Sequence, residues 1–377
     1  MAKQRAASKS LEVELRSLLG ELMMIPGLSG HEGRVRIAVA RHLAGLGLDT
    51  STDRMGNLIA TLPGDKRLPG VMLYAHLDQL GLIVRKIEPN GLVRVERVGG
   101  VPERALPSQA VIFCVGGGRA DVAGVIANKS HHATAPEEKY RVVPYAELYI
   151  DAGFDSRDAA LAAGIDVGTP VVYRPSVFDL GEGRIAGTAV DDRAGCAVVI
   201  AAARALSAVK ARPTVHVVFT VQEEFNLRGA VSAVHALQPD IAIQLDLILA
   251  TDTPDMAARG DVALGGGPAM SLYSFHGRGT LNGTLPHPAL VALFAKAAIS
   301  ESLALQRSAH VGALTDNSYV QVVGDGVACI DLGFPTRYTH SSLEVCDLSD
   351  LAGLTRLVVA GIAGIDRNFT LDRDQFV

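Results

Sequence analysis

Apolar residues recur at helical spacing over residues 11–24 and again over residues 32–46, which predicts two amphipathic helices near the start of the chain. The run 26–30, rich in glycine and proline, predicts a tight connection between them. Two short apolar runs at 57–62 and 71–75 are typical of strands. Because every residue of the run 71–75 is apolar, we expect that strand to be buried on both faces at the centre of a sheet.

The pattern changes between residues 82 and 173 to short β-like runs broken by glycine and proline, with one helical stretch at 156–164. From residue 190 onward longer strands and helices alternate, which predicts a mostly parallel sheet covered by helices on both faces, an α/β fold. We therefore expect an α/β domain made of residues 1–81 and 174–377, with a small β-rich domain inserted at 82–173. The helices expected in the second part are 194–209, 228–237 and 288–304, and the strands are 214–221, 240–246 and 327–332.

Composition and charge narrow the classes of partner. The net charge of −5 argues against a nucleic-acid partner, because proteins that bind nucleic acids usually carry a basic patch. No apolar run approaches the ~20 residues of a membrane helix, and no apolar segment follows the basic start, so we expect a cytoplasmic protein with no membrane partner. The four cysteines are scattered without a Cys-x-x-Cys pair, which argues against a disulfide framework and a zinc knuckle.

Side chains that can bind metal ions lie at the ends of several predicted elements. They are His76 and Asp78 after the strand 71–75, Asp191 before the helix 194–209, Glu223 and Glu224 after the strand 214–221, Asp246 at the end of the strand 240–246, and His340 beyond the strand 327–332. Ligands of open α/β sheets bind beyond the carboxyl ends of the strands, so we expect these side chains to meet there. Each motif alone is more typical of a helix cap or an exposed charge pair than of a metal site, and only their coincidence predicts a site.

Two histidines and three carboxylates suit a borderline dication such as zinc, cobalt or manganese. One ion would leave ligands unused, whereas a pair of ions about 3.5–4 Å apart would use them all. In this interpretation Asp191 bridges the two ions, His76 and Asp246 bind one ion, and Glu224 and His340 bind the other. The three carboxylates and one hydroxide would balance the charge of two divalent ions.

Glu223 and Glu224 are adjacent, and adjacent residues at a strand end point to opposite sides. We therefore expect Glu224 to bind an ion and Glu223 to act as a general base that accepts a proton from a water molecule. Asp78 lies two residues after His76, and we expect its carboxylate to accept the second N–H of the imidazole and fix its tautomer.

Motifs along almost the whole chain resemble those of the di-metal tetrahedral (TET) aminopeptidases, a group that includes glutamyl and deblocking aminopeptidases and relatives labelled endoglucanases. The matching motifs are PGLSGHE at 26–32, DRMGNLIA at 53–60, AHLD at 75–78, ELYID at 147–151, AVDDRAG at 189–195, QEE at 222–224, LRGA at 227–230, DTP at 252–254 and PTRYTHS at 335–341. The resemblance implies a zinc-exopeptidase-like fold and an exo-acting metallo-aminopeptidase that hydrolyses N-terminal residues from short peptides. It also implies that residues 82–173 form a dimerisation domain and that dimers assemble into a dodecamer.

The roles implied by the resemblance agree with the assignments above: Asp191 matches the bridging aspartate, Glu223 matches the general base, and the other ligands match their family positions. Gln79 departs from the glutamate usual in the family, and Phe225-Asn226 replaces a Val-Gly pair. Because of these departures, a second function remains an alternative, that of a dedicated dipeptidase or amidohydrolase for one small metabolite. A metal-binding assembly protein without catalysis is the other alternative. Asp316 matches a Thr-Asp pair of the family and is a candidate for binding the substrate amine.

Overall fold

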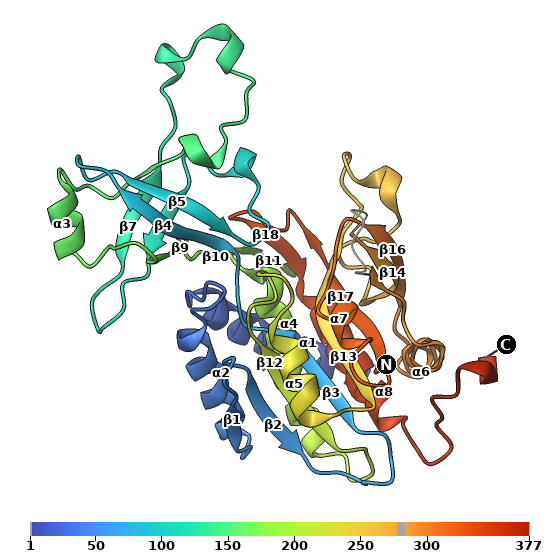
Figure 1. Ribbon diagram of the computed structural model, residues 1–377. Helices are drawn as coiled ribbons and strands as arrows, with labels where there is room; N and C mark the ends of the chain where they lie inside the picture. Colours follow the sequence, from blue (N-terminus) through green and yellow to red (C-terminus); the bar gives the residue numbers. More distant parts are fainter. Residues whose placement is uncertain (1, 277–282, 377) are drawn as a thin grey trace.

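The computed structural model describes residues 2–276 and 283–376, and a mixed sheet of twelve strands forms the centre of this part of the chain (Figure 1). Its strands are β1 (Thr50–Thr52), β2 (Leu58–Leu62), β3 (Val71–His76), β10 (Val177–Asp179), β11 (Arg184–Gly187), β12 (Val215–Thr220), β13 (Ile241–Leu249), β14 (Ala269–Phe275), β15 (Gly283–Thr284), β16 (Gln306–Val311), β17 (Ala328–Arg337) and β18 (Glu344–Asp347). They lie in the order β1-β2-β12-β3-β13-β17-β18-β11-β10, and β14 pairs with β15, β16 and β17.

Strand β3 lies inside the sheet and is buried along its whole length, as its apolar sequence predicts. Its residues alternate between two hydrophobic cores. Leu73 and Ala75 belong to the larger core with residues of α1, α4 and α8, while Met72 and Tyr74 belong to a smaller core with residues of α5 and α7. Because successive strand residues point to opposite faces, helices cover both sides of this strand. The helices are α1 (Ala2–Met23), α2 (Gly33–Gly45), α3 (Arg157–Ala162), α4 (Val190–Ser207), α5 (Gly229–Leu237), α6 (Pro288–Ser300), α7 (Asn317–Val320) and α8 (Leu348–Ala363).

Parallel pairing is limited to the four central strands and to the pair β14 and β16, and the other pairs are antiparallel, so the prediction of a mostly parallel sheet is wrong. Strands β12, β3, β13 and β17 run parallel to one another. Their neighbours β2, β14 and β18 are antiparallel to them, and β10 is antiparallel to β11. Short loops explain part of this pairing, because β1 and β2, β10 and β11, and β17 and β18 are joined by connections that permit only antiparallel pairing. The carboxyl ends of the four parallel strands nevertheless reach one edge, where the candidate residues lie.

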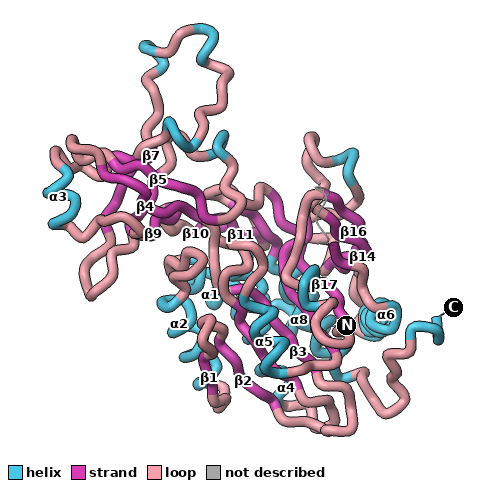
Figure 2. The backbone as a smooth tube through the Cα atoms, in the orientation of Figure 1, coloured by secondary structure: helices cyan, strands magenta, loops and turns pink. Residues whose placement is uncertain are grey.

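Strands from residues 81–173 form a separate closed barrel in the order β4-β5-β8-β7-β6-β9. Figure 1 shows this barrel beside one end of the sheet, and Figure 2 shows the long connection of residues 127–149 extending from it away from the sheet. Residues such as Phe113 and Ile150 fill a core that is distinct from the cores of the sheet. The barrel strands are β4 (Gly81–Ile87), β5 (Val93–Val98), β6 (Ala110–Phe113), β7 (Val122–Ile126), β8 (Ile150–Asp151) and β9 (Pro170–Tyr173).

Among the residues that the structure describes, no helix combines the length and the apolar character needed to cross a membrane.

Candidate metal centre

The candidate ligands gather at the edge where the parallel strands end. His76 is the last residue of β3 and is paired with Thr220, the last residue of β12. Glu223 and Glu224 lie three and four residues beyond the end of β12, Asp246 lies in the second half of β13, and His340 follows β17. Asp191 comes from the start of α4. The fold thus brings together all the residues that the sequence placed at strand ends.

These six side chains form two adjoining groups: His76 with Glu223 and Asp246, and Asp191 with Glu224 and His340. Within each group the potential ligand atoms lie within 4.8 Å of one another. The Asp191 carboxylate lies between the groups. Its Oδ1 is 3.0 Å from His76 Nε2, and its Oδ2 is 3.6 Å from His340 Nε2. Each oxygen of this carboxylate therefore faces the histidine of a different group.

The backbone at the start of α4 presents Asp191 to the histidines. Asp191 and Asp192 have φ/ψ values of −75°/107° and −117°/38°, so the regular helix begins only after them. Asp192 caps it, because its Oδ1 accepts the N–H of Gly195 at 3.0 Å, and its Oδ2 accepts the N–H of His76 at 3.2 Å. Asp192 thus has the capping role that was one of the alternative interpretations of the Asp191-Asp192 pair. Asp191 remains available to the site.

Asp78 supports the site through the backbone. Its carboxylate accepts the N–H groups of Glu223 and Glu224, both at 3.0 Å, and the hydroxyl of Ser29. The ring Nδ1 of His76 is 3.0 Å from the carbonyl oxygen of Asp78 and 3.5 Å from its carboxylate Oδ1. The nearer acceptor for the imidazole is therefore the main chain, whereas we expected the carboxylate. The carboxylate instead holds the segment that carries both glutamates.

Glu344 plays a similar supporting part that the sequence analysis missed. It is only 2% exposed, and it accepts the N–H of Asp191 at 3.0 Å, the N–H of His340 at 2.7 Å and the hydroxyl of Thr339 at 3.2 Å. Burial and the nearby Asp191 carboxylate raise the pKa of Glu344 to about 8. Glu344 thus ties together the two segments that carry Asp191 and His340. The only signal in the sequence was a carboxylate four residues after a candidate ligand.

The buried carboxylates are poorly compensated by the surrounding protein. Burial raises the pKa of Glu223 and of Asp246 well above the ordinary values, with a further rise from neighbouring carboxylates. Burial and Asp191 raise the pKa of Glu224 to about 7. Burial alone would lower the pKa of His340, but Glu224 and Asp191 raise it to about 9. Such shifts show an excess of negative charge that cations would relieve.

The donor atoms suit such cations. Among the described residues, the buried Oε1 of Glu224 has no hydrogen-bond partner, although buried carboxylate oxygens are normally paired. Imidazole nitrogens and carboxylate oxygens in two adjoining groups are the ligands that zinc and similar dications take in proteins. The residues present therefore fit two divalent ions.

A cavity of about 620 Å³ opens onto both groups. Glu223, Glu224, Asp246, Asp191 and His340 line it together with apolar side chains such as Leu247 and Leu314, and one of the departures from the family pattern, Asn226, also lies in its wall. This volume is typical of sites for small ligands.

The other positions singled out in the sequence lie outside this wall. Gln79 is buried, and its side-chain oxygen accepts the N–H of Gly27 at 3.1 Å. Phe225 is 42% exposed, with Arg228 over its ring. Asp316 is completely buried, its Oδ2 accepts the hydroxyl of Thr220, and burial raises its pKa to about 7. A direct contact between Asp316 and a substrate amine does not fit this burial.

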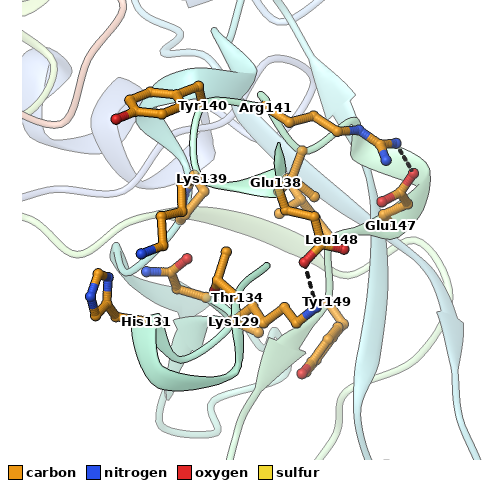
Figure 3. A pocket seen from close by; sticks show the side chains of 14 residues that line it. Lys129, His131, Thr134, Glu138, Lys139, Tyr140, Arg141, Glu147, Leu148 and Tyr149 are labelled. Carbon is orange, nitrogen blue, oxygen red and sulfur yellow. Dashed lines mark hydrogen bonds and ion pairs between the residues drawn. The ribbon is translucent and has the colours of Figure 1, made fainter. Parts of the chain in front are cut away.

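A second cavity, of about 660 Å³, lies in the connection of residues 127–149 (Figure 3). Two ion pairs occupy part of its wall: Lys129 with Glu138 at 2.6 Å and Arg141 with Glu147 at 2.7 Å. Within the described ranges, both groups of side chains able to hold a metal ion lie in the other cavity. The side chains that could hold metal ions therefore lie in the cavity at the edge of the sheet.

Comparisons with known proteins identify the family of this chain. The M42 glutamyl aminopeptidase family matches residues 56–357. The protein SgcX of Escherichia coli (strain K12) is 35% identical over 357 residues, which cover 94% of this chain and 95% of that protein. Lysyl aminopeptidase of Pyrococcus furiosus is 31% identical over 348 residues, covering 91% and 95% of the two chains. The solved TET1 peptidase of Pyrococcus horikoshii superposes with a TM-score of 0.82 at 28% identity and covers 92% and 99%. The chain therefore belongs to the M42 glutamyl aminopeptidase family and is a hydrolase.

Proposed function

We propose that this chain removes N-terminal residues from short peptides and that it holds two divalent ions for this purpose. His76 and Asp246 would bind one ion, Glu224 and His340 the other, and Asp191 both. The observation that carries this proposal is the position of the Asp191 carboxylate, which faces His76 at 3.0 Å with one oxygen and His340 at 3.6 Å with the other. Zinc, cobalt and manganese all suit this ligand set.

The ions would supply polarisation of the scissile carbonyl group and a lowered pKa of the attacking water. Glu223 would accept the proton of that water and pass it to the leaving amine. Its position supports this role, because Glu223 lines the cavity and lies in one group with His76 and Asp246. Asp78 would hold Glu223 in place through its backbone N–H.

We also propose the division into an α/β catalytic domain of residues 1–81 and 174–377 and an inserted dimerisation domain of residues 82–173. The separate closed barrel with its own core supports an independent role for that segment. The TET1 peptidase of Pyrococcus horikoshii is described as able to assemble into a tetrahedron or a large octahedral shell. By this analogy, dimers of the present chain would assemble into a dodecamer. A cytoplasmic location suits the four cysteines, which are all unpaired.

Replacing the proposed base tests the mechanism. Glu223→Gln should lower kcat for aminoacyl substrates by about 10²–10⁴-fold, the usual contribution of a general base. Metal content should stay near two ions per chain, because the proposed ligands remain. Glu182→Gln, at an exposed loop position, is the matched control and should retain full activity. An active Glu223→Gln enzyme would exclude this role.

Removal and return of the metal tests both the cofactor and the substrate class. Chelation should abolish hydrolysis of a panel of aminoacyl chromogenic substrates, and zinc, cobalt or manganese added separately should restore it. Acceptance of several aminoacyl substrates is expected of a general aminopeptidase. Turnover of a single dipeptide or amide alone would instead indicate a dedicated dipeptidase or amidohydrolase, and a loaded but inert protein would indicate an assembly protein.

Asp78→Asn should weaken zinc binding by about 10–100-fold, the usual effect of losing a group that orients metal ligands. The reason is that the amide keeps only one oxygen for the N–H groups of Glu223 and Glu224. Titration of the metal-free protein with zinc measures this change. Asp158→Asn, at an exposed helix position, should bind zinc as the unchanged chain does, and equal affinity in both variants would contradict the positioning role.

Sedimentation velocity tests the assembly. The full chain of 39.5 kDa should sediment as a twelve-chain particle, with dimers as the smaller species on dilution. Dimers alone at every concentration would argue against the dodecamer, and monomers alone would argue against the dimerisation domain.

A further inference from the structure

His340 follows a strand of the sheet, but its imidazole contacts the other part of the chain. Its Nδ1 lies 3.0 Å from the carbonyl oxygen of Gly100, which stands between β5 and the short 3-10 helix η1 (Glu103–Ala105). Because a carbonyl oxygen can only accept, Nδ1 carries the hydrogen in this contact. In the neutral imidazole, Nε2 then has a free lone pair. This nitrogen is the one that lies 3.6 Å from Asp191 Oδ2 and 3.8 Å from Glu224 Oε2.

Gly100 also leaves the space that the ring occupies. A Cβ built there would lie 2.7 Å from Nδ1 and 2.8 Å from Cε1 of His340, which is closer than side chains pack. The backbone N–H of His340 is held by Glu344 at 2.7 Å, so the main chain that carries the ring is fixed in place. Gly100 does not have a positive φ, so an alanine would suit its backbone conformation. Only the contact with the imidazole demands a glycine here.

In both histidines of the site, the ring Nδ1 faces a main-chain carbonyl oxygen, but the two carbonyl groups come from different parts of the chain. The ring Nδ1 of His76 faces the carbonyl oxygen of Asp78, two residues further along the chain. The corresponding carbonyl for His340 is 240 residues away in sequence and belongs to the connection that leaves the barrel strand β5. The adjacent Gly99 runs along Glu224, because a Cβ at Gly99 would lie 3.4 Å from the Glu224 Cβ. This connection therefore contacts one side chain of the group, His340, and passes close to a second, Glu224.

We propose that Gly100 is a positioning residue for one of the two metal sites. Its carbonyl oxygen selects the His340 tautomer with the hydrogen on Nδ1, which leaves Nε2 free to bind a metal ion. Because Gly100 has no side chain, there is room for the ring beside it. This inference rests on the proposed function only for the identity of what His340 binds. The contact between Gly100 and His340 is a property of the metal-free chain and can be tested separately.

The first experiment titrates the metal-free protein with zinc and resolves two dissociation constants. Gly100→Ala should raise one of them by about 10–100-fold and leave the other unchanged, because groups that orient a metal ligand usually contribute this much to affinity. The matched control is Gly116→Ala, also near a barrel strand, where a Cβ would meet nothing within 4 Å and φ is not positive. This control should bind both ions as the unchanged chain does. Two unaltered constants in Gly100→Ala would overturn the proposal.

The second experiment is a double-mutant cycle on urea unfolding of the metal-free protein. When His340 is present, Gly100→Ala should lower the urea concentration at the unfolding midpoint, because the new Cβ meets the imidazole. The same substitution should have no effect in the His340→Ala background, where that ring is absent. If Gly100→Ala alone does not fold, recovery of folding in the double variant gives the same support.

An equal loss in both backgrounds, or a double variant that also fails to fold, would overturn the proposal. Failure of the proposed function would be distinguishable, because a chain without peptidase activity would still give a readable unfolding cycle.

Discussion

Repulsion among carboxylates buried at one edge of the sheet is the constraint that governs the rest of the site. Asp191, Glu223, Glu224 and Asp246 lie within two adjoining groups, where burial makes negative charge costly. Arg193, also fully buried, reaches the side chain of Gln79 and the carbonyl of Ile25. The protein holds the cluster together with backbone N–H groups donated to Asp78, Asp192 and Glu344. Unlike the guanidinium of Arg193, these backbone N–H groups carry no net charge, so the carboxylates of the two groups leave room for dications.

The meeting of the candidate ligands could be predicted from the sequence because it follows from topology. Parallel strands end at the same edge, so His76 and Glu223, which lie far apart along the chain, are neighbours once β3 and β12 pair. The supporting contacts could not be predicted in the same way. Those of Glu344 and Gly100 depend on the exact approach of two distant segments, and a glycine or glutamate in a loop carries no sign of such an approach.

Some elements of the fold could likewise be predicted from the hydrophobic pattern, and others could not. The apolar strands β2, β3, β12 and β13 were predictable because burial leaves a clear hydrophobic signal. Strand β16 was missed because its alternation of half-buried and exposed positions is carried mostly by polar residues. Helix α8 was also missed, although Leu348, Leu351 and Leu354 follow helical spacing and Asp347 caps its first turn. That signal was present in the sequence.

The insertion of the barrel between β3 and β12 has a consequence for synthesis on the ribosome. Strand β3 leaves the ribosome early, but both of its partners, β12 and β13, follow only after the whole barrel segment has been made. During that interval β3 has two unpaired hydrogen-bonding edges and a run of apolar residues, 71–75, which is the kind of segment that aggregates. Strand β3 therefore gains its native partners on both edges only after translation passes residue 249.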